Sequence, residues 1–217
     1  MSIVNAEKRL AAEAAAALVR DGMRVGLGTG STVALLVAAL ARSRPRATYV
    51  ASSPATEAAA REVGLAVSPF DAITTLDLAI DGADQVAADL WLVKGGGGAH
   101  TREKVIAASA ERFVVIVDST KLVESLRAPV PVEVLAFGAE ATMHRLALTT
   151  RRDAPASPDG GVIVDYHGEF DDPAALAARL SGTPGVVEHG LFAPHLVAEV
   201  LVGHDGTVRR LNLGDVP

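Results

Sequence analysis

Two charged side chains flank a run of glycines near the middle of the chain. Lys94 precedes four consecutive glycines at residues 95–98, and Glu103 follows them closely. Glycine has no Cβ, so a backbone of this kind can approach a ligand and present bare N–H groups to it. An ammonium, a row of N–H donors and a carboxylate could together stabilise an oxyanion and move a proton at carbon. We interpret the segment as a candidate catalytic turn; a glycine-rich surface loop before a helix is the alternative.

A pair of aspartates precedes this segment. Asp81 and Asp84 follow the largely apolar residues 76–80, which places them at the carboxyl edge of an expected strand, where open α/β sheets bind ligands. The six histidines include no pair at the spacing of a metal-binding helix. We therefore favour hydrogen bonding to sugar hydroxyls over metal ligation, with helix capping by one aspartate as the alternative.

A third motif, at residues 26–32, follows an expected strand and opens an expected helix. This position offers free N–H groups and the positive end of a helix to an anion. Thr29, Ser31 and Thr32 add hydroxyl groups suited to phosphate. The motif lacks the third glycine of a dinucleotide fingerprint and the Gly-Lys-Ser/Thr of a nucleotide P-loop. A monophosphate fits it better than ATP or NAD, and a tight turn with an N-cap serine is the alternative.

The elements that must position these motifs alternate between strand and helix over the first two-thirds of the chain. Apolar runs predict strands at residues 23–27, 48–51, 76–80, 90–93 and 113–117. Helical patterns occupy residues 5–20, 33–41, 55–63 and 102–110. This alternation predicts an α/β fold with a doubly wound, mostly parallel, Rossmann-like sheet and helices on both faces.

The pattern changes after residues 129–131. Strands are expected at residues 132–136, 162–166 and 185–187, and helices at residues 139–148 and 173–180, around a polar, turn-rich break at residues 151–161. We predict a catalytic domain at residues 1–128 and a smaller α+β domain at residues 129–202. Residues 203–217 are expected to return to the first domain, and the apolar runs at 196–202 and 208–211 to pair or join its sheet.

Bulk composition narrows the classes of function. The chain has 217 residues, of which 49% are hydrophobic, and a net charge of -6 that argues against nucleic acid as a partner. It contains no cysteine, which excludes disulfides, thiolate catalysis and cysteine zinc sites. No apolar run approaches the roughly 20 residues that span a bilayer. Glu13 interrupts the alanine-rich residues 11–19, so we expect a helix of a cytoplasmic protein rather than a signal peptide.

Taken together, the motifs resemble the A-type ribose-5-phosphate isomerases. The matching segments are residues 28–32, 81–84, 94–98, 102–104, 129–134 and 185–192. The resemblance covers most of the chain. It implies reversible conversion of D-ribose 5-phosphate to D-ribulose 5-phosphate in the non-oxidative pentose phosphate pathway, without metal or cofactor, in a homodimer or homotetramer.

The resemblance also implies residue roles. Glu103 would be the base that moves a proton between C1 and C2, and Lys94 would stabilise oxyanion charge. Asp81 and Asp84 would bind sugar hydroxyls and assist ring opening. The implied substrate-binding residues are Lys8, Thr29, Gly30, Ser31, Thr32, Asp81, Gly82, Ala83, Asp84, Lys94, Gly95, Gly96, Gly97 and Lys121. Lys121 matches a substrate-contacting lysine of the family, and Lys8 is a weaker candidate for binding the phosphate.

The chain departs from the family pattern at Gln85, usually glutamate, at His100, usually apolar, and at residues 157–161. Three other functions are compatible with parts of the sequence. A non-catalytic sugar-phosphate-sensing domain would need a DNA-reading module, for which we expect no room before Asn5. A nicotinamide-dependent oxidoreductase is opposed by the missing third glycine. An isomerase for another aldose phosphate is the nearest alternative.

Overall fold

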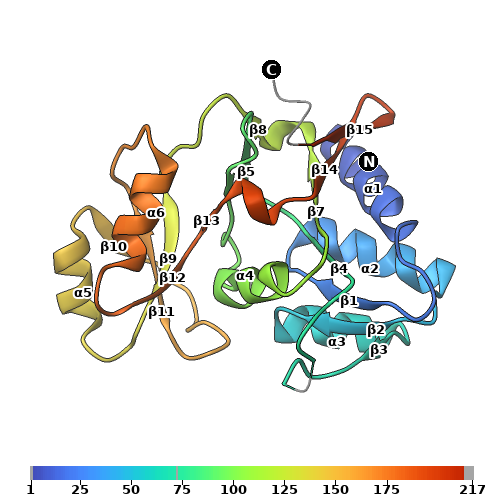
Figure 1. The fold of residues 1–217 in the computed structure, drawn as a ribbon, viewed down its shortest axis with the longest axis horizontal. Coiled ribbons are helices and arrows are strands. Elements are labelled where there is room, and N and C mark those ends of the chain that lie inside the picture. Colours follow the sequence, from blue (N-terminus) through green and yellow to red (C-terminus); the bar gives the residue numbers. More distant parts are fainter. Residues whose placement is uncertain (1, 72, 213–217) are drawn as a thin grey trace.

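The computed structural model describes residues 2–71 and 73–212, which form two lobes (Figure 1). The larger lobe is built on a seven-stranded sheet with the order β15-β14-β7-β4-β1-β2-β3. All neighbouring strands are parallel except β15, which is antiparallel to β14. The strands are β1 (Arg24–Leu27), β2 (Thr48–Ala51), β3 (Ala66–Val67), β4 (Leu78–Asp81), β7 (Phe113–Asp118), β14 (Glu199–His204) and β15 (Thr207–Leu211).

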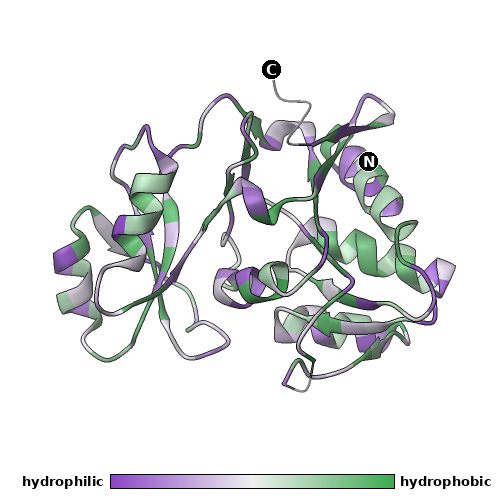
Figure 2. Ribbon diagram, in the orientation of Figure 1, coloured by the Kyte–Doolittle hydropathy of each residue, from purple (hydrophilic) through white to green (hydrophobic). Residues whose placement is uncertain are grey.

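Helices cover both faces of this sheet, because its central strands are apolar on both sides. In β7, Val114 and Ile116 belong to one core cluster and Val115 and Val117 to another, as the alternation of strand side chains requires. The first cluster includes residues of α1 (Ile3–Ala16), α2 (Ser31–Ser43) and α3 (Pro54–Glu62). The second includes residues of α4 (His100–Ala108). Figure 2 shows the apolar residues concentrated along α2 and the central strands.

The smaller lobe holds a four-stranded antiparallel sheet with the order β10-β11-β9-β12. Its elements are β9 (Val130–Val134), α5 (Ala139–Leu146), β10 (Thr149–Arg151), β11 (Val162–Tyr166), α6 (Pro173–Ser181) and β12 (Val186–His189). Leu146 of α5 and Leu180 of α6 pack with Val132 and Val164 in a third core cluster. This lobe therefore has its own core.

A second four-stranded sheet lies between the two lobes. Its order is β13-β6-β5-β8, formed by β5 (Gln85–Ala87), β6 (Leu92–Val93), β8 (Leu122–Val123) and β13 (Leu191–Phe192). Adjacent side chains face opposite lobes: Leu92 and Phe192 join a core of the larger lobe, whereas Val93 and Leu191 join the core of the smaller one. Lys94 and the glycine turn at residues 95–98 follow β6 directly, so this sheet places them between the lobes.

The predicted fold class is confirmed, and the element boundaries shift by a few residues. The first helix begins at Ile3 because Ser2 caps it, accepting a hydrogen bond from Asn5 N. The boundary predicted at residue 203 falls inside β14, whose residues 199–203 pair with β7, so the main sheet takes in residues from 199 onward. Residues 213–217 lie outside the described residues. The turn-rich break predicted at residues 151–161 begins with the end of β10.

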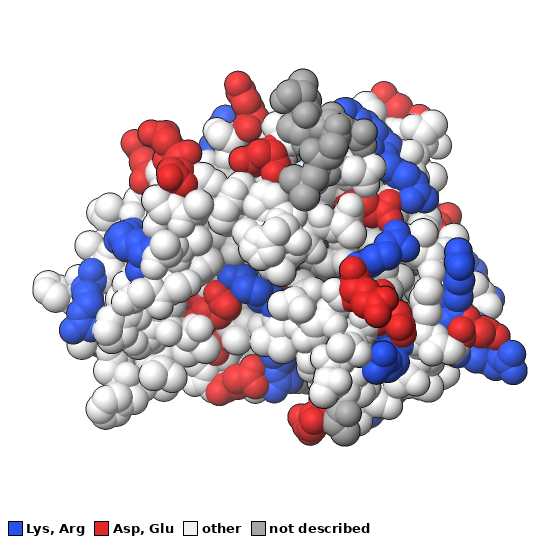
Figure 3. Space-filling model, viewed as in Figure 1, with Lys and Arg blue, Asp and Glu red and all other residues white. Residues whose placement is uncertain are grey.

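The surface is mixed in charge. On the face drawn in Figure 3, acidic and basic side chains occur in small interspersed groups. Among the described residues, no helix is long and apolar enough to span a bilayer.

Candidate active site

The three motifs meet at the carboxyl edge of the main sheet. The order places β1 beside β4, with the earlier β2 and β3 on one side and the later β7 and β14 on the other, so the strand order reverses at β1 and β4. Such a switch point is where open α/β sheets bind ligands. Asp81 Oδ1 at the end of β4 accepts hydrogen bonds from Thr29 N (3.0 Å), which follows β1, and from Gly82 N (2.7 Å).

Gly28 makes this arrangement possible. A Cβ at residue 28 would lie 1.8 Å from the Asp81 carboxylate. No side chain fits between the end of β1 and Asp81, so the glycine is required by close approach.

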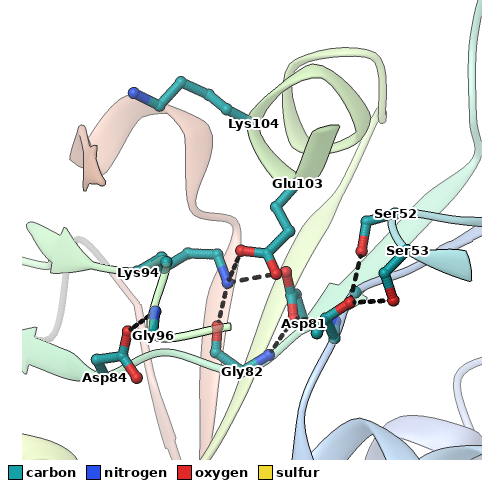
Figure 4. A network of polar contacts seen from close by, with 12 residues as sticks. Ser52, Ser53, Asp81, Gly82, Asp84, Lys94, Gly96, Glu103 and Lys104 are labelled. Atoms are coloured by element: carbon teal, nitrogen blue, oxygen red, sulfur yellow. Dashed lines mark hydrogen bonds and ion pairs between the residues drawn. The ribbon is translucent and has the colours of Figure 1, made fainter. Parts of the chain in front are cut away.

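Lys94 lies between two carboxylates at this edge. Its Nζ is 2.8 Å from Asp81 Oδ2 and 3.2 Å from Glu103 Oε2, and it donates to the carbonyl oxygen of Gly82 (Figure 4). All three charged residues are buried: Asp81 and Lys94 are 3% exposed, and Glu103 is 6% exposed. Lys94 follows β6, whereas Glu103 lies in the first turn of α4. The predicted catalytic residues thus form one buried cluster.

Burial and charge set the protonation of this cluster. Burial, reinforced by the negative charge of Asp81, raises the pKa of Glu103 to about 7, although Lys94 opposes the shift. Burial likewise raises the pKa of Asp81 against the influence of Lys94. Burial alone would lower the pKa of Lys94, but Asp81 and Glu103 outweigh it and hold the pKa above its usual value. The result is a permanent cation beside a carboxyl group that titrates near neutral pH, the property expected of a general base.

The glycine turn is held by Asp84. Asp84 Oδ2 accepts a hydrogen bond from Gly96 N at 2.8 Å, and a Cβ at residue 96 would approach Asp84 Oδ1 to 2.8 Å. Gly95 has a φ of +105° and Gly98 a φ of +72°, which favour glycine over other residues. Asp84 therefore anchors the turn with one of its oxygens, a contact that the sequence did not reveal.

A cavity of about 200 Å³ opens over these groups. Every residue of the predicted site lines it except Asp81, which contacts Lys94. The lining residues are Lys8, Thr29, Gly30, Ser31, Thr32, Gly82, Ala83, Asp84, Lys94, Gly95, Gly96, Gly97, Glu103, Val117 and Lys121. Lys8 Nζ donates to Ser31 Oγ at 3.0 Å. Three lysines and the N-terminus of α2 thus give the cavity a surface suited to an anionic group.

Some supporting residues were missed from the sequence. The Thr29 hydroxyl, which we expected to face the ligand, donates to Ser53 Oγ at 2.7 Å. Thr56 Oγ1 in turn donates to the carbonyl of Gly28 at 2.8 Å. Ser53 follows β2 and caps α3, so it lies at the same edge of the sheet. Its position after a predicted strand and before a predicted helix was the signal in the sequence that could have identified it. The ring centroid of Phe192 lies 5.4 Å from Lys94 Nζ, within the range of a cation–π contact.

The three departures from the family pattern each have a structural setting. Gln85 exchanges two hydrogen bonds of 2.8 Å with the backbone of Arg127, accepting one and donating the other. His100 is fully buried, and burial lowers its pKa to about 4. Ser157 donates to the buried Glu133, which also accepts from Thr101 of α4. None of the three removes a group from the cavity.

Comparison with known proteins gives the same family from sequence and structure. A sequence profile described as Ribose 5-phosphate isomerase A (phosphoriboisomerase A) matches residues 48–207. The chain is 44% identical to ribose-5-phosphate isomerase A of Caulobacter vibrioides over 94% of this chain and 97% of the relative. It is 45% identical to that of Roseiflexus sp. over 94% and 95%.

Solved structures agree. Ribose 5 phosphate isomerase A from Neisseria gonorrhoeae superposes with a TM-score of 0.93 at 31% identity, covering 98% of both chains. A D-ribose-5-phosphate isomerase in complex with phospho-erythronic acid gives a TM-score of 0.90 at 34% identity, covering 98% of this chain and 100% of the other. Across the matched profile, the sequence relatives and these folds, the chain belongs to the ribose 5-phosphate isomerase A family.

Proposed function

We propose that this protein interconverts D-ribose 5-phosphate and D-ribulose 5-phosphate by moving a proton between C2 and C1 through an enediolate. The observation that carries the proposal is the buried Lys94, which is in contact with both Asp81 and Glu103 at the cavity. A carboxylate that titrates near neutral pH beside a fixed cation suits the abstraction of a proton next to a carbonyl group.

Glu103 removes the proton from C2 of the open-chain aldose. The electron pair of the broken C–H bond forms the C1–C2 double bond, and negative charge collects on O1. Glu103 then returns its proton to C1 while the hydroxyl proton of O2 is lost and O1 is protonated, which gives the ketose. No atom is gained or lost overall, because one carboxylate serves as base and then as acid.

Lys94 and the backbone N–H groups of the glycine turn stabilise the charge on O1. Such charge stabilisation is strongest where water is excluded, and the Lys94 side chain is almost entirely buried, with 3% of it exposed. Asp81 keeps the Lys94 ammonium in place and assists ring opening. The N-terminus of α2, with Lys8 and Lys121, binds the phosphate group of the substrate.

We also propose that the protein self-associates as a dimer or tetramer. Apolar side chains exposed on the described surface support this: Phe137 is 92% exposed and Leu148 66%. Light scattering would measure the mass in solution, and a monomer at micromolar concentration would contradict the proposal.

The test of function is a substrate panel. The purified protein is dialysed against chelator and supplied with ribose 5-phosphate, arabinose 5-phosphate or glucose 6-phosphate, and aldose–ketose conversion is followed by NMR. Rapid conversion of ribose 5-phosphate alone is expected. Equilibrium binding without turnover would favour a sensing domain, and faster conversion of another sugar would reassign the substrate. Activity that returns only when Mg²⁺ or Zn²⁺ is added would exclude the metal-free mechanism.

A further inference from the structure

Arg152 of the smaller lobe contacts the glycine turn at residues 95–98, which lies between the lobes. Its Nε lies 3.0 Å from Asp165 Oδ2, and its Nη2 donates to Asp165 Oδ1, which makes a two-pronged pair. Its Nη1 is directed at the turn and donates to the carbonyl oxygens of Gly95 (2.9 Å) and Gly96 (3.1 Å). The side chains of Arg152 and Asp165 are 20% and 17% exposed, so this guanidinium is largely shielded from water.

These two contacts determine which way the peptide groups of the turn face. In a trans peptide the C=O and the following N–H point in opposite directions. With the Gly95 carbonyl on Arg152, the Gly96 N–H points away from Arg152 and donates to Asp84 (Figure 4). With the Gly96 carbonyl also on Arg152, the Gly97 N–H points away from Arg152 as well, and Gly97 lines the cavity.

Orientation needs such a restraint because the turn is all glycine. Glycine populates positive and negative φ about equally, so a peptide between two glycines reorients at little steric cost. A single guanidinium that bridges two consecutive carbonyls and is itself fixed by a carboxylate selects one orientation. Lysine offers only a point charge on a flexible stem and cannot keep both sets of contacts.

We propose that Arg152, held by Asp165, is a positioning residue that aims the Gly97 N–H at the reacting oxygen of the substrate. The inference rests on the proposed isomerase function and makes the smaller lobe part of the catalytic apparatus. A second pair between the lobes serves as a contrast: Arg102 of α4 makes a two-pronged contact with Asp159 but donates to no carbonyl of the glycine turn.

The experiment compares Arg152→Lys and Arg152→Met with Arg151→Met. Arg151 is the adjacent, exposed arginine at the end of β10 and is the matched control. For each protein, kcat and KM are measured with ribose 5-phosphate, and the Kd for phospho-erythronic acid is measured by calorimetry. The carboxylate of this compound resembles the planar oxygens of an enediolate, so its affinity reports on stabilisation of the intermediate. Circular dichroism and Tm verify folding.

We expect both Arg152 variants to lose about 10- to 100-fold in kcat with little change in KM, because the lost donor acts mainly on the developing oxyanion. The Kd for phospho-erythronic acid should rise by a similar factor, whereas Arg151→Met should match the wild type. If Arg152→Met does not fold, Arg152→Lys decides, since it keeps the charge and the stem.

Three outcomes would overturn the inference. They are a kcat within about twofold of wild type in folded Arg152→Lys, a loss confined to KM, and an equal loss in Arg151→Met. The proposed function fails separately, if the wild type converts no ribose 5-phosphate. The calorimetric comparison would still test the aim of the Gly97 N–H in that case, because it requires no turnover.

Discussion

The raised pKa of Glu103 predicts an acid limb in the pH profile near neutrality. A general base works only as the carboxylate, and the pKa of Glu103 is about 7 instead of 4.5 because of burial and the neighbouring Asp81. This shift corresponds to about 3 kcal/mol in favour of the protonated form. The ionised fraction falls to about one-tenth at pH 6 and one-hundredth at pH 5, so kcat/KM should fall about tenfold per pH unit below 7.

The assay measures initial rates of ribulose 5-phosphate formation at substrate concentrations well below KM, from about pH 5 to pH 8.5 at constant ionic strength. The phosphate of the substrate has its own pKa near 6 and could change binding over the same range. The pH dependence of the Kd for phospho-erythronic acid is therefore measured as well, and the rates are corrected for this change in binding. The apparent midpoint belongs to the Glu103–Asp81 pair together, because the two carboxyl groups interact.

A second arm uses Asp81→Asn. This change removes the nearby negative charge that helps to raise the Glu103 pKa and leaves Glu103 as the one carboxylate paired with Lys94 among these three residues. Whatever rate remains should therefore have its acid limb at lower pH. A flat profile down to about pH 5.5, a midpoint near pH 4.5, or an acid limb that moves to higher pH in Asp81→Asn would contradict this origin of the raised Glu103 pKa.

Three further predictions concern Lys94, Gly28 and His100. Lys94→Arg should lose about 100-fold or more in kcat, nearly as much as Lys94→Ala, because the planar fork does not fit a site already bounded by two carboxylates; steady-state kinetics with near-normal turnover would contradict this. Gly28→Ala should reduce kcat by about 100-fold, since its Cβ would displace the Asp81 carboxylate, whereas Gly22→Ala, in open space at a φ of +86°, should cost only about 1 kcal/mol of stability. Folded His100 stays neutral until about pH 4, so its contribution to stability is lost as pH falls from 6.5 towards 4. Measured by urea unfolding, the free energy of unfolding of the wild type should fall by about 2 kcal/mol more than that of His100→Leu between about pH 7.5 and pH 5. An equal pH dependence of stability in the two proteins would exclude His100 as the origin of the effect.

The sequence predicted the sheet and its functional edge because both depend on local signals. The apolar run before Asp81 and the glycines after β1 mark strand ends, and parallel strands bring their carboxyl ends together. The four-glycine run likewise identified the turn that carries Lys94.

What remained hidden depends on contacts between distant residues. The sheet that contains β13 and β6 has strands of two or three residues, too short for any periodicity to register. Arg152 meets Gly95 across 57 positions of the chain, and Ser157 meets Glu133 across the smaller lobe. Nothing in the local sequence distinguishes Arg152 from the exposed Arg151 beside it.

The substitution Glu103→Gln tests whether Glu103 abstracts the substrate proton. The change keeps size and helix propensity and removes the base. Wild type and variant, matched for folded content by circular dichroism, are incubated with ribose 5-phosphate in D₂O, and NMR follows both isomerisation and exchange of the C2 proton. Both rates should fall together by about 10²–10⁴-fold or more, with substrate binding retained. Exchange at the wild-type rate in Glu103→Gln would contradict the account and make Asp81 the next candidate for the base.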